Sequence, residues 1–151
     1  MRNTQIPLFS PETEWVMPEE LKDLKGCKKI AIDLETNDPN LKETGSGNVA
    51  GEGHIAGIAV AVEGWSGYFP VHHEQGGNMD KKLVFSWLQN ILNQTDTTFI
   101  FHNAMYDVCW LRKEGLSIKG HIVDTMIAAS LIDENRLSYQ LNTLAKHYVG
   151  I

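Results

Sequence analysis

The sequence predicts an α/β domain in which a mixed β-sheet is flanked by helices, and three observations predict it. Short apolar or β-branched runs, such as 29–36 and 97–101, have the composition of buried strands. Amphipathic runs of helical period, such as the one that follows Asp80, lie between such strands. The chain has 151 residues, of which 42% are hydrophobic and 21% charged, and this suits one domain with a sizeable core.

The N-terminal residues 1–25 are expected to form a lead-in to this domain. Pro7, Pro11 and Pro18 interrupt any long element here, while apolar side chains such as Leu21 could dock on the main body. We find no internal repeat and no low-complexity tract. The chain is therefore divided into a lead-in over 1–25 and one α/β domain over 26–151.

The first strand, at about 28–35, ends in two acids. Strand side chains alternate between faces, so Asp33 and Glu35 point to one face and Ile30 and Ile32 to the other. Two neighbouring carboxylates repel each other and are desolvated together, which is unfavourable unless a cation lies between them. One interpretation is a Mg²⁺ or Mn²⁺ site, because these ions take oxygen ligands. The other is a strand end with two solvated acids, and a D-x-E pattern alone does not decide between them.

Two further strands are expected after a glycine-rich segment. The stretch 44–53 contains four glycines in ten residues and is predicted to be a mobile loop. The run 55–62 is rich in β-formers, and a turn over 64–67 leads into 68–71 as an antiparallel continuation of the sheet. His72-His73-Glu74 follows on a loop, where it could bind a metal, although adjacent loop histidines more often lie in solvent.

Three capping residues indicate helices. Asp80 is a predicted N-cap for a helix with an apolar face. That face is formed by Leu83, Val84, Trp87, Leu88, Ile91 and Leu92. A last short strand at 118–123 leads into Asp124, which we interpret as the N-cap of a helix through Asp133 in preference to a catalytic acid. Ser138 is predicted to cap a final helix.

A strand–helix junction carries a second set of polar residues. The strand at 97–101 runs into a helix that is expected to end at Gly115. Asn103 and Asp107 are four residues apart and share a helix face near its start. Asn103 as a cap and Asp107 as an acid near the helix N-terminus both have structural explanations. Functional sites of α/β sheets nevertheless gather where strands end.

Charge and cysteine content limit the function classes. The net charge of −6 argues against a domain that holds nucleic acid by broad phosphate neutralisation, although bound divalent ions would cancel several charges at a site. Cys27 and Cys109 have no metal-motif spacing and suggest no disulfide framework, so a reducing cytoplasm is expected. We find no membrane-spanning run and no secretory signal.

Three motifs follow one another along the chain: Asp33-x-Glu35 at a strand end, Asn103-x-x-x-Asp107 at the junction, and Asp124-Thr125-Met126 at a helix start. In this order and spacing they resemble the 3′–5′ proofreading exonuclease domain of family A DNA polymerases. Stretches such as 101–107 and 141–146 look like bacteriophage members in particular. The resemblance covers about residues 27–150 and implies a ribonuclease H-like fold.

The resemblance also implies a site. Asp33, Glu35 and Asp107 would be catalytic acids that hold two divalent ions, Mg²⁺ or Mn²⁺, for an in-line displacement at phosphorus. Four residues match positions of the family at the substrate: Thr36, His102, Asn103 and Tyr106. The first three match nucleotide contacts, and the tyrosine is expected mainly to pack. The natural substrate would be a single-stranded DNA 3′ end, which can enter a narrow site.

One family feature is missing. The third motif, Tyr or His followed by Asp, carries the fourth carboxylate, and Tyr139 does not supply it because Thr143 stands four residues on. We therefore expect a C-terminally incomplete fold, from a longer polymerase, a truncated protein or a split enzyme, and the isolated chain could be inactive. The exposed apolar surface would favour a polymerase domain in cis or in trans, or self-association. For a bacteriophage protein the expected location is the host cytoplasm.

Two alternatives remain open on the sequence. The chain could be a non-catalytic nucleic-acid-binding or protein-interaction module that keeps the exonuclease fold, as the missing fourth acid suggests. It could also be a related RNA-trimming exonuclease, because the site alone does not determine the sugar preference.

Overall fold

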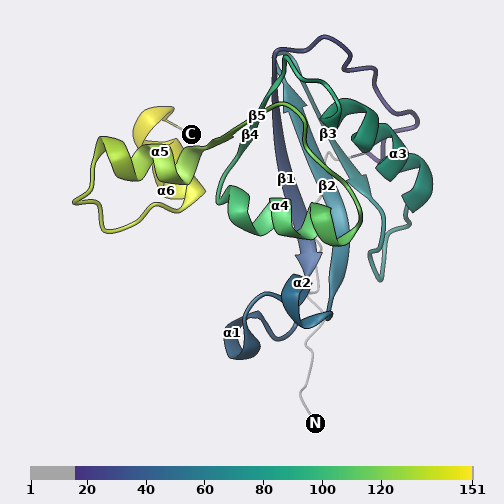
Figure 1. Ribbon diagram of the computed structural model, residues 1–151, viewed down its shortest axis with the longest axis horizontal. Coiled ribbons are helices and arrows are strands. Elements are labelled where there is room, and N and C mark those ends of the chain that lie inside the picture. The colour runs from purple at the N-terminus through teal and green to yellow at the C-terminus, as the bar shows by residue number, and fades with distance from the viewer. Residues whose placement is uncertain (1–15, 151) are drawn as a thin grey trace.

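Five strands form one mixed sheet in the order β3-β2-β1-β4-β5 (Figure 1). The computed structural model describes residues 16–150. The strands are β1 (Lys29–Asn37), β2 (His54–Val62), β3 (Trp65–Pro70), β4 (Thr98–Phe101) and β5 (His121–Asp124). The first three pair antiparallel, whereas β4 lies parallel to both β1 and β5. The predicted α/β class with a mixed sheet is confirmed.

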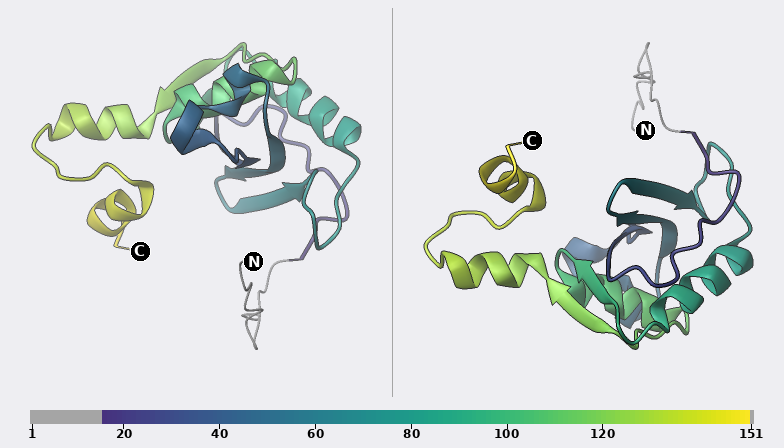
Figure 2. Two further views of the ribbon diagram at one scale, coloured as in Figure 1. Left: turned by 90° about the horizontal axis from the view of Figure 1, so that it is seen from below. Right: turned by 90° about the horizontal axis from the view of Figure 1, so that it is seen from above.

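Two helices cover one face of the sheet and enclose the core. The helices are α1 (Leu41–Thr44), α2 (Gly47–Ala50), α3 (Lys81–Leu92), α4 (Ala104–Lys113), α5 (Thr125–Ile132) and α6 (Leu141–Tyr148). In Figure 2, α3 and α4 lie on the same side of the strands. Ile30 and Ile32 of β1 are buried there with Val84 and Leu88 of α3 and Trp110 of α4. Burial of this apolar face is the main stabilising contribution to the fold.

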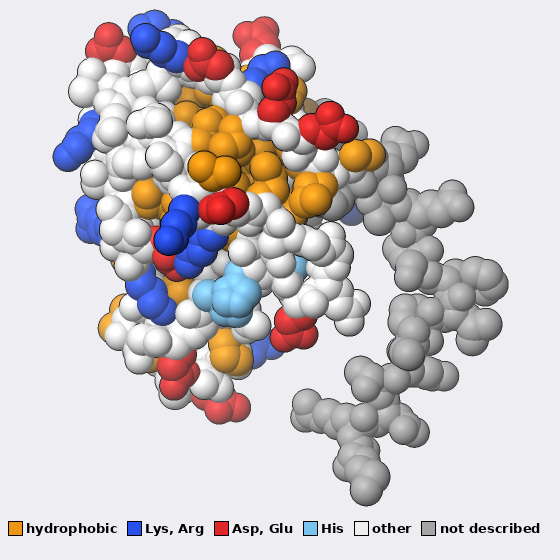
Figure 3. All heavy atoms as spheres, turned by 90° about the vertical axis from the view of Figure 1, so that its right-hand side faces the viewer, with side chains coloured by type: hydrophobic (Ala, Val, Ile, Leu, Met, Phe, Trp, Pro, Cys, Tyr) orange, Lys and Arg blue, Asp and Glu red, His pale blue; other side chains and the backbone are white. Residues whose placement is uncertain are grey.

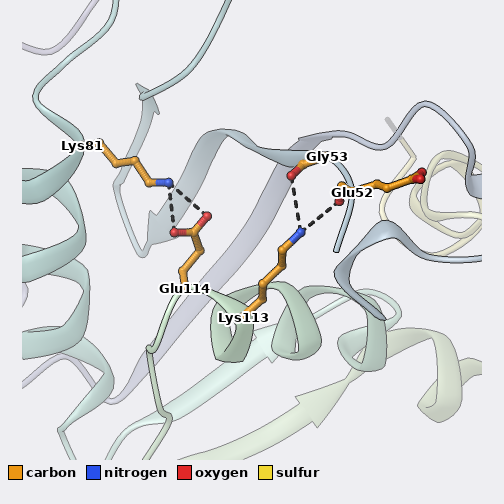
Figure 4. Close-up of polar contacts among 5 residues, drawn as sticks. All are labelled: Glu52, Gly53, Lys81, Lys113 and Glu114. Atoms are coloured by element: carbon orange, nitrogen blue, oxygen red, sulfur yellow. Dashed lines mark hydrogen bonds and ion pairs between the residues drawn. The ribbon is translucent and has the colours of Figure 1, made fainter. Parts of the chain in front are cut away.

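Two lysines connect α3 and α4 to their surroundings, as Figure 4 shows. Lys81, at the start of α3, forms an ion pair with Glu114 at the end of α4, with an N–O distance of 2.9 Å. Lys113 donates to the carbonyl oxygens of Glu52 at 2.9 Å and Gly53 at 3.4 Å, just before β2. These contacts hold the C-terminal end of α4, so its N-terminal end stays next to β1.

The predicted mobile loop at 44–53 contains short helices. The Asp38 carboxylate accepts the N–H of Gly47 at 3.1 Å, at the start of α2, and Asn40 donates to Glu52 at 2.6 Å. These contacts bring residues up to twelve positions apart together. The glycine content therefore misled the prediction, because side-chain bonds from the end of β1 order this segment.

Two boundaries also differ from the sequence prediction. The strand β3 begins at Trp65, because only Glu63 and Gly64 separate it from its partner Val62 in β2. The final helix begins at Leu141 with Gln140 as N-cap, so the predicted cap Ser138 is wrong. The Ser138 hydroxyl instead accepts the N–H of Gln140 at 3.3 Å, two residues on. The predicted caps Asp80 and Asp124 are confirmed.

The segment before β1 contacts the body through its last residues. Of the predicted lead-in 1–25, residues 1–15 lie outside the described part of the chain. Leu24 is buried in the core, with Leu21 packed against it. The indole N–H of Trp87 in α3 donates to the carbonyl oxygen of Lys22 at 2.8 Å.

The helices α5 and α6 stand apart from the sheet in both views of Figure 2. They carry exposed apolar side chains, among them Ile127, Leu131 and Ile132 in α5 and Leu141 in α6. Apolar side chains are thus exposed on these two helices, as expected. Within residues 16–150, none of the helices has the length and apolar character needed to cross a bilayer.

Candidate active site

The strand β1 presents Asp33 and Glu35 on the sheet face opposite the core. Both acids are exposed, whereas Ile32 and Leu34 between and beside them are buried at 3% and 7% exposure. This confirms the alternation predicted from the sequence. The β1–β2 register shifts between Glu35 and Thr36, and such bulges bend a strand and redirect its side chains.

A cleft of about 760 Å³ lies over this face. Its floor is formed by small residues of two neighbouring strands, Ala31 in β1 and Ala59 in β2. Asp33 and His102 lie in its wall, with part of the N-terminal segment 16–22 along the other side. The volume is large enough for a nucleotide-sized ligand.

The helix α4 brings Asp107 to the same strand. Because β4 pairs with β1 only over 29–31, the β1 edge beyond that point is not occupied by β4. There the Asp107 carboxylate accepts the backbone N–H of Leu34 at 3.1 Å. Leu34 is the residue that separates Asp33 from Glu35 in the sequence. Asp107 is only 3% exposed. Asp107, 74 positions beyond Asp33 in the sequence, thus lies against β1 and close enough for the Asp33 charge to raise its pKa.

The electrostatics of these acids favour a nearby cation. The pKa of Asp107 is raised to about 7. Burial is the largest cause, the charges of Asp33 and Asp124 also raise the pKa, and the N–H of Leu34 opposes the rise. Desolvation also raises the pKa of Asp33, while nearby His102 lowers it. Two acids with raised pKa values that repel each other are stabilised in their charged forms by a positive ion between them.

Asp124 positions the start of α4. Its carboxylate accepts the N–H of Asn103 at 3.1 Å and that of Ala104 at 2.8 Å, and it also caps α5 through Met126 and Ile127. Burial raises the pKa of Asp124, but these four N–H donors lower it more, so the net shift is downward. A carboxylate with four donors is a structural anchor, which agrees with its interpretation as a cap.

Asn103 adopts a left-handed backbone at the start of α4. Among residues 16–150 it is the one non-glycine residue with positive φ, at 68°. A left-handed residue with a Cβ costs roughly 1 kcal/mol or more, less for asparagine than for most residues. Asn103 occupies the N-cap position, but its side chain forms no capping bond and is exposed. Its amide therefore points away from the helix backbone.

His102 and Tyr106 are both bonded within the protein. The His102 ring donates from Nε2 to the carbonyl oxygen of Tyr139 at 2.9 Å and bonds through Nδ1 with Thr125 at 2.9 Å. The Tyr106 hydroxyl donates to Asp38 at 3.0 Å and accepts from Thr36 at 2.7 Å. Thr36 and Tyr106 are thus brought together, and Tyr106 packs against the core as expected.

The fit of these residues to divalent ions follows from their chemistry. Within residues 16–150, no three His, Cys, Asp or Glu side chains are placed to hold one ion together. The adjacent acids Asp33 and Asp107 offer oxygen donors and repel each other, and Mg²⁺ and Mn²⁺ prefer such donors. The oxygen donors of Asp33 and Asp107 thus suit a divalent ion by their chemistry.

Two residues near the site were missed by the sequence reasoning. Asp38 holds Tyr106, and Tyr68 of β3 lines the cleft. Tyr68 lies on the same face of the sheet as Ala59 and Asp33, because these residues are partners in the strand register. The sequence does not reveal that register directly.

The mixed five-stranded sheet with its flanking helices has the ribonuclease H-like fold of the solved exonucleases to which it is similar. The chain belongs to the 3′–5′ exonuclease family of the family A DNA polymerases, whose sequence model matches residues 10–151.

Known proteins agree with this assignment. The chain is 34% identical over 157 residues to the DNA-directed DNA polymerase of Pseudomonas phage M6, covering 98% of the chain and 23% of that protein. It is 26% identical over 136 residues to DNA polymerase I of Pseudomonas aeruginosa, covering 86% of the chain and 14% of that protein. The chain thus spans less than a quarter of the length of either relative.

Among solved structures, that of Brucella melitensis NrnC with bound Mg²⁺ superposes with a TM-score of 0.61 and 16% identity. The match covers 83% of this chain and 55% of that one. At this identity the likeness concerns the fold alone.

Proposed function

We propose that the chain is the proofreading part of a DNA polymerase and removes nucleotides from single-stranded DNA 3′ ends in a metal-dependent reaction. The observation that carries the proposal is the bond from Leu34 N–H to Asp107, which brings this buried acid to the edge of the strand that carries Asp33 and Glu35. Family membership supports the hydrolytic activity. The finer features, strand preference and metal dependence, rest on the arrangement of the acids and the cleft.

Asp33, Glu35 and Asp107 would hold two divalent ions, Mg²⁺ or Mn²⁺. When bound, the ions supply an activated water and stabilise charge on the departing 3′-oxygen. The chain's own residues bind and orient the strand. The cleft over Ala31 and Ala59 accepts the terminal nucleotide, and its small floor lets a sugar and base approach the acids closely.

Polar groups around the acids would orient the 3′ end. The Asn103 amide makes no capping bond and is available to the terminal nucleotides. His102 has both ring nitrogens bonded inside the protein, so it would present its ring face or edge to the substrate. Thr36 and Tyr106, joined by a 2.7 Å bond, would border the strand near the end of β1.

The proposed partner is a polymerase domain, in cis or in trans. The relatives are polymerases several times longer than the matched region, which supports this proposal. The exposed apolar side chains of α5 and α6 offer a surface for such a domain or for a second copy of the chain. The proposed place of action is the host cytoplasm.

The test is 3′ shortening of a labelled single strand by the purified chain with Mn²⁺ or Mg²⁺. We expect shortening from the 3′ end that EDTA stops, with DNA preferred to RNA of the same sequence. Asp33→Ala and Glu35→Ala should abolish it, whereas Glu63→Gln, at an exposed acid in the β2–β3 turn, should not.

Calorimetric titration with Mn²⁺ provides the second measurement. Divalent binding that is lost in Asp33→Ala is expected. A folded chain without divalent binding and without shortening would contradict the proposal and favour the non-catalytic module. Shortening of RNA but not of DNA would contradict the proofreading role.

A further inference from the structure

Tyr68 lies across the second strand, on the same face as the acids. In the strand register Tyr68 of β3 pairs with Ala59 of β2, and Ala59 pairs with Asp33 of β1. Directly opposite residues project to the same face. The ring reaches Gly57 as well, because a Cβ on Gly57 would lie 1.9 Å from the phenol oxygen and 2.3 Å from Cζ. The hydroxyl thus occupies the space that a side chain at position 57 would fill.

That space is next to Glu35. Gly57 is the register partner of Glu35, and opposite residues have Cβ positions about 5 Å apart. The phenol oxygen therefore stands beside the Glu35 side chain. The pKa of Tyr68 agrees with this placement, since burial raises it and the Glu35 charge raises it further. The bulge between Glu35 and Thr36 begins at this point.

His73 holds the phenol from the other side. Its Nε2 forms a hydrogen bond with the Tyr68 hydroxyl, and the two rings meet edge to face with centroids 5.8 Å apart. The backbone of His73 is itself fixed by Asn78, whose side chain accepts from its N–H at 2.7 Å and donates to its carbonyl at 2.9 Å.

This loop lies on a histidine-bearing surface. Histidine side chains gather on the side of the molecule shown in Figure 3, and His54 stacks on His72 with centroids 3.8 Å apart. Glu35, His54, His72 and His73 border a depression that continues from the end of β1. The loop is thus attached to the sheet next to the acid, and its His73 contacts Tyr68 directly.

We propose that Tyr68, held by His73, is a positioning residue that fixes the orientation of the Glu35 carboxylate. If Nε2–H of His73 donates to the phenol oxygen, the phenol proton is left for the carboxylate of Glu35. Groups that bond a metal-binding acid from behind fix its orientation, and their loss weakens metal binding. The inference rests on the function proposed above, in which Glu35 holds an ion. If Tyr68 only attached the loop to the sheet, its replacement would have the same effect whether or not Glu35 was present.

A double-mutant cycle separates these roles. Four proteins are compared: the natural chain, Tyr68→Phe, Glu35→Ala and the double variant. Mn²⁺ affinity by calorimetry is the readout in all four, and the rate of 3′ shortening is a second readout in the two proteins that keep Glu35. Tyr68→Phe should weaken Mn²⁺ binding about 10-fold or more in the natural chain and have little effect in Glu35→Ala. Equal factors in both backgrounds would overturn the proposal. Tyr148→Phe, on the distant helix α6, is the matched control and should change neither readout.

A metal-free measurement makes the inference independent of activity. In EDTA, thermal unfolding of the same four proteins should show that the effects of Tyr68→Phe and Glu35→Ala are not additive. Additive shifts in melting temperature would refute the contact between the two side chains. Gly57→Ala should lower the melting temperature in the natural chain and less in Tyr68→Ala, since the new methyl group collides with the phenol. The chain could show this coupling yet neither bind Mn²⁺ nor shorten DNA. That outcome would confirm the contact between Tyr68 and Glu35 but refute the proposed function and, with it, the positioning role.

Discussion

Replacing the buried acid Asp107 by asparagine tests the electrostatic basis of the site. The pKa of this carboxyl rises from 3.8 to about 7, chiefly through burial. An acid with a raised folded-state pKa binds its proton more tightly in the folded chain than in the unfolded one. The stability it contributes is therefore complete below pH 3.8 and is lost as pH rises toward 7.

The magnitude follows from the two pKa values. The folded-state pKa of Asp107 lies about three units above its ordinary value, and this corresponds to about 4 kcal/mol of unfolding free energy that is lost above pH 7. Asparagine keeps an oxygen that can accept the N–H of Leu34, now 3.1 Å from Asp107, and it has no charge. The asparagine variant should thus gain stability over the natural chain by about 1.4 kcal/mol per pH unit between pH 4 and pH 7.

The assay is urea unfolding in EDTA at pH 4.5, 5.5, 6.5 and 8. The quantity compared is the unfolding free energy of Asp107→Asn minus that of the natural chain. Glu63→Gln, at an exposed acid in the β2–β3 turn, is the control for the loss of a carboxylate away from Asp107. A difference for Asp107→Asn that stays flat from pH 4.5 to 8 would refute the reasoning.

Three further predictions concern stability and association. Tyr106→Phe removes the hydroxyl that bonds Thr36 at 2.7 Å and Asp38 at 3.0 Å. Urea unfolding should show that the unfolding free energy falls by about 1–2 kcal/mol, and an unchanged midpoint would contradict these bonds. Asn103→Gly should raise the unfolding free energy by about 0.5–1 kcal/mol, because glycine adopts a φ of 68° without a Cβ penalty. A lower unfolding free energy would show that the asparagine side chain stabilises the fold by more than the backbone strain costs. Leu131→Glu, at a side chain of α5 that is 82% exposed, should change the unfolding free energy by less than about 0.5 kcal/mol. It should reduce self-association in sedimentation experiments, and unchanged association would exclude this face of α5 as the interface.

Local patterns in the sequence were sufficient for several features of the fold. The alternation along β1, which buries Ile32 and exposes Asp33 and Glu35, follows from strand geometry alone. The caps Asp80 and Asp124 were also predictable, because each bonds N–H groups two and three residues on. Where a local rule failed, as at Ser138, the helix began a few residues further along the chain.

Features that depend on distant residues needed the tertiary structure. The ordering of α2 depends on Asp38, and the left-handed backbone of Asn103 accompanies bonds from Asp124 to the start of α4. Neither contact leaves a periodic signal in the sequence. The position of Tyr68 over Gly57 likewise depends on the pairing of three strands.

The sequence by itself determined the class of the domain, most of its strands and longer helices, and the family that it resembles. Only the tertiary structure decided that Asp107 is buried against Leu34, that its pKa rises to about 7, and that Tyr68 stands beside Glu35. The physical reason is that hydrophobic periodicity and capping act within a few residues, whereas desolvation and charge repulsion depend on which distant groups the folded sheet brings together.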